Sequence, residues 1–375
     1  MSRLESREAI APRPADSIDS TGPTGSAERP APTTRTRSPL ARRRLAAAAL
    51  VVVALGVCIV LALCLGEMWI PPADVVTAIL GTGDAGGLDF VVRELRGPRV
   101  VGALLVGACL GMSGSITQSL LRNPLASPDI IGITAGASCL AVVGLLATSS
   151  ASAFAPESGT ITVPALAVVG GALTGLLVVL LSWRGGLESR RVILVGLGVN
   201  AGLSAFTSWL LVRADLPDLT AAMIWLTGSL SAVEPGTLRP AVIGAAICLL
   251  LAGLTSRYLG LLRLGELTVR SLGVNVPLAQ LTQAAIAVVA ASLACAIAGP
   301  VAFVAFASPQ IAMFLFRTPG PPVAGGALIG ALVVVAADIA ARTVFPTPVP
   351  VGLVTSFAGA PVLLWLLTRY TGRRA

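Results

Sequence analysis

Residues 95–138 read LRGPRVVGALLVGACLGMSGSITQSLLRNPLASPDIIGITAGAS. Two apolar runs rich in Gly, Ala and Ser flank a polar elbow at residues 122–129. Neither run has the polar face of a helix on a soluble protein. In a lipid bilayer both can span, and their small residues let neighbouring backbones approach closely. Pro124 and Pro128 favour an extended chain between them. The stretch predicts two membrane-spanning helices joined by a short elbow.

The composition of the 375-residue chain predicts the same class of protein. The chain is 55% hydrophobic and 12% charged, with a mean hydropathy of +0.88. A soluble domain carries roughly 25% charged residues. We therefore expect an all-α, polytopic integral membrane protein.

All 26 basic residues are Arg, and the missing Lys and His exclude several kinds of site. A Walker A loop needs Lys, while an HExxH zinc site and a Ser-His-Asp triad need His. The six cysteines lie in apolar runs without a CxxC motif, which is typical of small core or lipid-facing residues. We predict no catalytic residue, no metal site and no cofactor, and we do not expect an enzyme.

Hydropathy along the chain predicts ten membrane-spanning helices, judged against a hydrocarbon core of roughly 30 Å and a rise of about 1.5 Å per residue. Shorter helices outside the core are predicted at residues 73–80, 219–230 and 266–272. The predicted spans are residues 45–66, 99–120, 130–147, 163–182, 192–212, 240–255, 278–298, 300–316, 323–339 and 351–367.

Residues 1–44 are predicted to form a disordered cytoplasmic tail, because they are rich in Pro, Ser, Thr, Ala and Arg and have no hydrophobic period. The ten-helix domain then covers residues 45–375. Six Arg fall in loops predicted outside and the other 20 fall inside, so the positive-inside rule favours cytoplasmic N and C termini. This topology explains the pI near 10.1 without nucleic-acid binding, for which no basic-aromatic platform is present.

A row of polar residues lies on the second predicted span. Helix packing explains the row, and a water-facing side of a transport path is the alternative interpretation. The row comprises Ser113, Ser115, Thr117 and Gln118.

Ionisable residues deep within the predicted spans are almost absent. Asp338 and Arg342 lie near the end of one span, four residues apart, and can pair on one helix face. A proton- or sodium-coupled transporter usually needs intramembrane carboxylates or unwound ion sites. We therefore expect the energy source to be a partner ATPase.

The best candidate for a contact with such a partner is the loop at residues 264–276, LGELTVRSLGVNV. A short helix between Gly265 and Gly273 can dock in a groove on another protein. An ordinary linker between spans is the alternative interpretation. At the level of the whole chain, an ion-coupled secondary transporter and a membrane-embedded enzyme are the alternatives to an ATP-driven permease.

Several motifs together resemble the membrane permease subunit of type II ABC importers for ferric siderophores, haem and cobalamin. The resemblance extends from residue 45 to the C-terminus. It implies a ten-helix half-permease in a bacterial plasma membrane, working with an ATP-binding subunit, a second permease subunit and an external binding protein. The motifs are RxPR…SGxxxQxxxRNPLAxP, LGExxxRxLG, GPVAFVAFASP and PVGLVTxxxGAPVLLWLL.

The resemblance also implies roles for particular residues. The LGExxxRxLG loop resembles the helix that couples the permease to its ATPase, which places Gly265, Glu266, Arg270 and Gly273 there. The elbow and the loop after the fourth span resemble the cytoplasmic gate, with Asn123, Leu125, Ser189 and Arg190; Gln118 is the candidate on the adjoining path. The external arginines that receive acidic side chains of the binding protein correspond to Arg96, Arg99 and Arg342.

The chain departs from the family pattern at three positions. The usual GLxxPHxxR segment reads AFASPQIAM, so that Gln310 replaces His and Met313 replaces Arg. Pro348 replaces the usual Glu of ExPxG. We therefore favour a heterodimer, whose second permease subunit keeps these residues, over a homodimer. The expected cargo is a ferric siderophore, with haem and cobalamin as alternatives.

Overall fold

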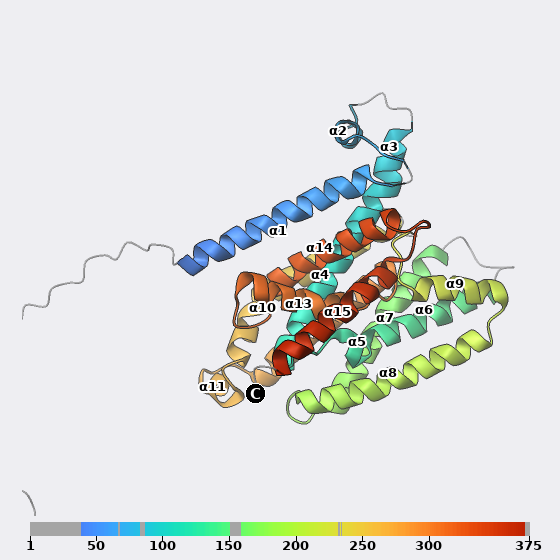
Figure 1. Cartoon of the computed structure of the whole chain (residues 1–375). Helices are drawn as coiled ribbons and strands as arrows, with labels where there is room; N and C mark the ends of the chain where they lie inside the picture. The colour runs from blue at the N-terminus through green and yellow to red at the C-terminus, as the bar shows by residue number, and fades with distance from the viewer. Residues whose placement is uncertain are drawn as a thin grey trace, which may run out of the picture. The chain divides into compact units, whose positions relative to one another are not determined.

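The computed structural model of the chain describes residues 39–66, 68–82, 87–150, 159–231, 233 and 235–371, which are almost entirely helical (Figure 1). The first helix begins at Pro39, ahead of the predicted start at residue 45. The rest of the predicted tail, residues 1–38, lies outside the described residues.

Each of the ten predicted spans coincides with a helix. Among the described residues, seven helices are long and apolar enough to cross a membrane, and α6, α13 and α15 contribute shorter apolar segments. The prediction of an all-α, polytopic protein is confirmed. The ten helices are α1 (Pro39–Cys64), α4 (Gly97–Leu120), α6 (Ile133–Ser150), α7 (Gly159–Ser182), α8 (Ser189–Val212), α10 (Pro235–Leu262), α12 (Val276–Ala298), α13 (Val304–Phe316), α14 (Val323–Thr343) and α15 (Val351–Thr371).

The connections between these helices hold the shorter elements. The three short helices predicted from the sequence are present, although α9 begins and ends earlier than predicted. A π-helical segment, η1, leads directly into α4. The short elements are α2 (Pro72–Leu80), α3 (Leu88–Phe90), η1 (Val91–Arg96), α5 (Pro128–Ile131), α9 (Leu216–Leu226) and α11 (Glu266–Ser271).

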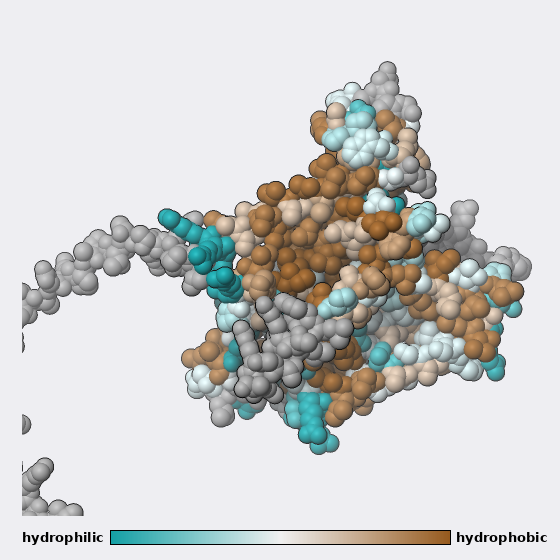
Figure 2. Space-filling view, in the orientation of Figure 1, coloured by the Kyte–Doolittle hydropathy of each residue, from teal (hydrophilic) through white to brown (hydrophobic). Residues whose placement is uncertain are grey.

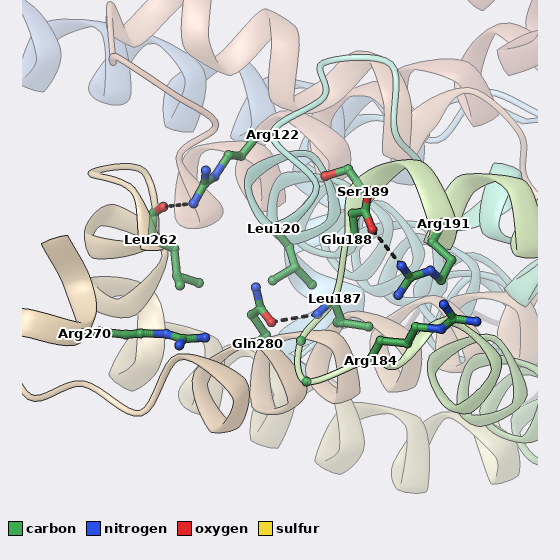
Figure 3. Close-up of a pocket in the computed structure, with 12 residues that line it drawn as sticks. Leu120, Arg122, Arg184, Leu187, Glu188, Ser189, Arg191, Leu262, Arg270 and Gln280 are labelled. Atoms are coloured by element: carbon green, nitrogen blue, oxygen red, sulfur yellow. Dashed lines mark hydrogen bonds and ion pairs between the residues drawn. The ribbon is translucent and has the colours of Figure 1, made fainter. Parts of the chain in front are cut away.

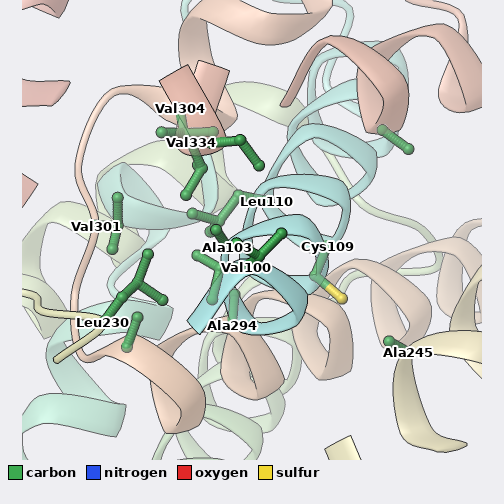
Figure 4. Packing of buried hydrophobic residues seen from close by; sticks show 14 of the residues in the cluster. Val100, Ala103, Cys109, Leu110, Leu230, Ala245, Ala294, Val301, Val304 and Val334 are labelled. Carbon is green, nitrogen blue, oxygen red and sulfur yellow. The ribbon is translucent and has the colours of Figure 1, made fainter. Parts of the chain in front are cut away.

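Helix α4 lies at the centre of the bundle. It packs against α14, α12, α13 and α10, and α1 covers α14 from the other side. Its side chains Val100, Ala103 and Leu110 meet Ala294 of α12 and Val334 of α14 in the main hydrophobic core (Figure 4). Helices α6, α7 and α8 form a second layer, in which α7 packs on α12 and α6, and α6 packs on α8, while α15 packs on α14 and α13.

The contact between α4 and α14 is made by backbone. A Cβ atom on Gly107 would overlap the carbonyl oxygen of Gly330, and one on Gly111 would overlap that of Gly326. A GxxxG step on α4, Gly107 and Gly111, therefore meets a second GxxxG step on α14, Gly326 and Gly330. Small residues at both surfaces allow this approach in a membrane.

The surface agrees with a bilayer setting. On the face shown in Figure 2, apolar side chains cover the middle of the bundle and hydrophilic residues gather toward helix ends. Exposed apolar residues include Val53 and Val57 of α1 and Leu250 and Leu254 of α10. The two ends of the bundle are named after the short helices that lie there. Helices α1 and α14 finish at the α2 end, and helices α4, α10 and α13 finish at the α11 end.

The Gly107→Ala variant tests the α4–α14 contact. We expect it to lower the melting temperature in detergent, because the added methyl group must push two backbones apart, and overpacking typically costs about 1–3 kcal/mol. Gly198→Ala is the matched control, because nothing lies within 4 Å of a Cβ atom there. Equal melting temperatures for the two variants would contradict the contact.

Candidate functional site

The predicted coupling loop forms a helix between two glycines. Gly265 and Gly273 have φ angles of +99° and +77°, which residues other than glycine rarely adopt. Val269, on the inner face of α11, is fully buried against Leu262 and Val276, at the ends of α10 and α12. The loop helix is therefore fixed to the ends of two long helices.

The outward side of this loop is apolar in part. Leu264 and Leu272, which flank α11, are both 60% exposed. An exposed apolar surface of this kind is typical of a site that contacts another protein.

A pocket of about 440 Å³ opens beside α11 (Figure 3). It brings the predicted coupling residue Arg270 together with the predicted gate residue Ser189. Arg190, the neighbouring gate candidate, is exposed in the first turn of α8 and does not line the pocket. The polar residues that line it are Arg122, Arg184, Glu188, Ser189, Arg191, Arg270 and Gln280.

Hydrogen bonds attach three elements to one another around this pocket. The hydroxyl of Ser189 donates to the carbonyl of Leu121, 2.5 Å away, and so fastens the start of α8 to the end of α4. The side-chain oxygen of Gln280, in α12, accepts the backbone N–H of Leu187 at 2.9 Å. The turn before α8 is thus held by both α4 and α12.

Two arginines link the end of α10 with the end of α4 in opposite directions. Arg122, just after α4, donates to the carbonyl of Leu262 at 2.6 Å. Arg263, just after α10, donates to the hydroxyl of Ser119 at 3.0 Å and to the carbonyl of Pro321 at 3.1 Å. We call these three hydrogen bonds the arginine clamp. They connect the end of α10, which leads into α11, to the central helix and to the turn between α13 and α14.

The clamp residues are held in defined positions. Arg122 has a φ angle of +48°, and the guanidinium of Arg263 lies where a Cβ atom on Gly320 would be. Burial lowers the pKa of Arg263 from its ordinary value. Neither role could be predicted from the sequence, because the positive-inside rule already explains a basic residue at this end of a span.

The elbow between α4 and α5 contains the predicted gate residues Asn123 and Leu125. The side-chain oxygen of Asn123 accepts the N–H of Leu125 at 2.9 Å, which closes a turn within the elbow. Leu125 packs against the cluster formed by Phe306 and Ala307 of α13, against which Val362 of α15 also packs. The elbow therefore contacts a helix that follows it by well over a hundred residues.

Gln118 joins α4 to α13 next to this elbow. Its amide oxygen accepts Nε2 of Gln310 at 2.6 Å, and its own Nε2 donates to the carbonyl of Phe306 at 3.1 Å. Gln118 is 2% exposed, so the structure places it in the interior between α4 and α13. Two others of the predicted polar row, Ser113 and Ser115, donate to the carbonyls of Ala287 and Gly111.

The three predicted docking arginines lie together at the α2 end, and each contacts other groups of the chain. Arg96 is 7% exposed and donates to the carbonyls of Leu63 and Cys64, at 2.7 and 2.9 Å. Arg342 donates to the carbonyl of Leu65 at 3.0 Å. These bonds go to carbonyl groups at and just after the C-terminal end of α1, where partners within the helix are missing.

Asp338 joins the other two arginines. Its carboxylate lies 2.8 Å from Arg99 and 3.0 Å from Arg342, so the predicted Asp338–Arg342 pair is confirmed and Arg99 is added to it. The side chains of Asp338 and Arg342 are 1% and 10% exposed, whereas Arg99 keeps 20% of its surface. The cluster connects the α2 ends of α4, α14 and α1.

Helices of bilayer length around one central helix, with a short loop helix presented at one end, are the architecture of a multi-pass transport permease. The chain belongs to the FecCD transport family, which matches residues 53–369. It is 38% identical over 310 residues to the ferric enterobactin transport system permease protein FepG of Escherichia coli (strain K12), covering 82% of this chain and 91% of that protein.

Two further relatives and one solved structure are also similar to this chain. The achromobactin transport system permease protein CbrC of Dickeya dadantii (strain 3937) is 37% identical over 81% of this chain and 86% of its own. The iron(3+)-hydroxamate import system permease protein FhuG of Bacillus subtilis (strain 168) is 34% identical over 81% and 91%. An inward-facing metal-chelate type ABC transporter has the same fold, with a TM-score of 0.72, 24% identity and coverage of 87% of this chain and 99% of that one.

The Asp338→Asn variant tests the arginine cluster. Removing the carboxylate leaves two guanidinium groups without their common partner, and breaking a buried ion pair costs about 3–5 kcal/mol. We expect a clear fall in the melting temperature in detergent. Glu188→Gln is the control, because the Glu188–Arg191 pair is exposed and such pairs contribute about 0–1 kcal/mol. A fall no larger than that of the control would contradict the stabilising role.

Proposed function

We propose that this chain forms one half of the membrane path of an ATP-driven importer, which receives a ferric siderophore or a similar metal chelate from an external binding protein. The relatives whose names refer to enterobactin, achromobactin and iron hydroxamate support this substrate class. The observation that carries the proposal is α11, a glycine-bounded helix with exposed leucines beside it, attached through the arginine clamp to the central helix.

In this proposal the ATPase subunit docks on α11 from the cytoplasm. Glu266 and Arg270 supply charge to the contact, and Gly265 and Gly273 give the loop helix its sharp ends. A displacement of α11 reaches α4 through the end of α10 next to it, because Arg122 of the α4 end bonds to Leu262 and Arg263 of the α10 end bonds to Ser119. ATP hydrolysis takes place on the partner, so the chain itself is not assigned a catalytic role.

The gate is proposed at the elbow and at the start of α8. Leu125 supplies an apolar plug, Asn123 shapes the turn that presents it, and Gln118 anchors that turn to α13. Ser189 connects the start of α8 to the same place on α4, while Arg190 lies next to it on the exposed side. One movement at the end of α4 therefore acts on both sides of the gate.

Docking of the binding protein is proposed at the α2 end. Arg99 is the most exposed of the three arginines and is suited to a carboxylate on the partner. Arg96 and Arg342 fix the end of α1 beside it, so they position the docking surface. The Arg99→Gln variant tests this role. If Arg99 binds a carboxylate of the binding protein, association of the variant is expected to depend less on salt than association of the wild type. A purely structural role leaves the salt dependence unchanged.

A second permease subunit is proposed to complete the path, and we favour a heterodimer. Helix α8 supports such a contact: Gly198 and Gly202 are exposed, and nothing lies within 4 Å of a Cβ atom on either. Gln310, Met313 and Pro348 favour a different partner over a second copy. The assembly is placed in the plasma membrane of a bacterium, with both termini of this chain in the cytoplasm.

Uptake measurements test the proposed function. A strain that lacks this chain is expected to lose uptake of a labelled ferric siderophore and to regain it with the gene restored. ATP depletion is expected to stop uptake, and collapse of the proton gradient alone is not. Uptake that continues after ATP depletion would favour an ion-coupled transporter. Uptake of only haem or cobalamin would replace the ferric siderophore as the proposed cargo.

Two variants separate docking from coupling. Glu266→Arg is expected to reduce co-purification of the ATPase and to abolish uptake, because like charges facing each other at an interface cost several kcal/mol. Arg263→Gln is expected to keep the ATPase bound but to lower uptake about ten-fold per ATP hydrolysed, because it removes charge-assisted hydrogen bonds worth roughly 1.5–3 kcal/mol each.

The matched control for Arg263→Gln is Arg257→Gln, in the last turns of α10, where the guanidinium lies 5.3 Å over the ring of Tyr258. This variant is expected to transport like wild type. Normal uptake by Arg263→Gln would show that the clamp does not transmit movement, and normal ATPase binding by Glu266→Arg would remove α11 as the docking element.

A further inference from the structure

A second pocket at the α11 end lies away from the coupling loop and is lined mainly by arginine. It measures about 330 Å³ and lies between the first turns of α1 and the C-terminal end of α13. Arg44 donates to the carbonyl of Arg317 at 3.2 Å, which joins the two helices across it. The lining residues are Arg43, Arg44, Leu315, Phe316 and Arg317.

The positive charge of this pocket favours an anionic ligand. Three guanidinium groups line it, and among the described residues no acidic side chain does. The pocket also lies at the N-terminal end of α1, a 26-residue helix whose dipole favours negative charge at that end. The C-terminal carbonyls of α13 act in the opposite direction, but Arg44 already neutralises the nearest of them, on Arg317.

The position of the pocket indicates which anion it holds. Helices α1 and α13 are apolar, and the pocket lies where both end, at the depth of lipid headgroups. Figure 2 shows the hydrophilic start of α1 directly beside the apolar surface of the bundle. Leu315 and Phe316 give the pocket an apolar wall, which suits a ligand carrying both a phosphate and hydrocarbon.

We propose that this pocket binds the phosphate of an anionic phospholipid, with Arg43, Arg44 and Arg317 as its ligands. The lipid then ties the start of α1 to the end of α13. This tie matters because only 22% of the apolar span of α1 is buried against the rest of the chain. The site is independent of the transported cargo and of the coupling loop.

Lipid binding is measured on the detergent-solubilised chain by native mass spectrometry with added phosphatidylglycerol. The Arg43→Gln, Arg317→Gln double variant leaves the Arg44 hydrogen bond intact, and we expect about 30-fold weaker binding, since each arginine near a membrane surface contributes about 1 kcal/mol to anionic-lipid binding. Arg257→Gln, at the same end of the bundle, is the control and is expected to bind as wild type does. Equal weakening in both variants would show diffuse attraction and would overturn the site.

Two further arms identify the ligand. Phosphatidylglycerol is expected to raise the melting temperature of the wild type more than phosphatidylcholine does, and this difference is expected to shrink in the double variant. Inorganic phosphate that gives the same protection as phosphatidylglycerol would assign the pocket to a free anion and overturn the lipid. Should the double variant fail to fold, Arg43→Gln alone gives the same comparison, because Arg43 is exposed on α1.

Discussion

The backbones of α4 and α14 touch each other, and the rest of the bundle is arranged around that contact. Lipid provides no hydrophobic force between helices, so close van der Waals packing must hold them together. Glycine at 107, 111, 326 and 330 makes that packing possible. With no side chain between them, the two helices form a tightly packed pair.

Arginine side chains also join neighbouring helices to one another, at both ends of the bundle. The last carbonyls of a helix have no partner within the helix, and in a membrane protein an unsatisfied carbonyl is costly. A guanidinium reaches such groups from a neighbouring helix and brings a positive charge to the negative end of the helix dipole. Four arginines act in this way: Arg93 contacts the end of α2, Arg96 and Arg342 contact the end of α1, and Arg122 contacts the end of α10.

Hydropathy and glycine spacing predicted the ten helices and the loop helix, because both signals are local. The predicted helix ends were less accurate than the predicted helices. Helix α10 begins at Pro235, before the predicted residue 240, because helical turns outside the lipid carry no hydropathy signal. The clamp was not predicted, because nothing near Arg122 in the sequence indicates a carbonyl on Leu262. The bond between Gln118 and Gln310 was not predicted either, because the two residues lie 192 positions apart in the sequence.

The contact between Gln118 and Gln310 does not depend on pH. A histidine at the second position would change its charge between about pH 5 and 8. Such a contact would gain a proton, and with it a buried charge, as the pH falls. Two amides do not titrate, so the contact between α4 and α13 has the same strength across this range.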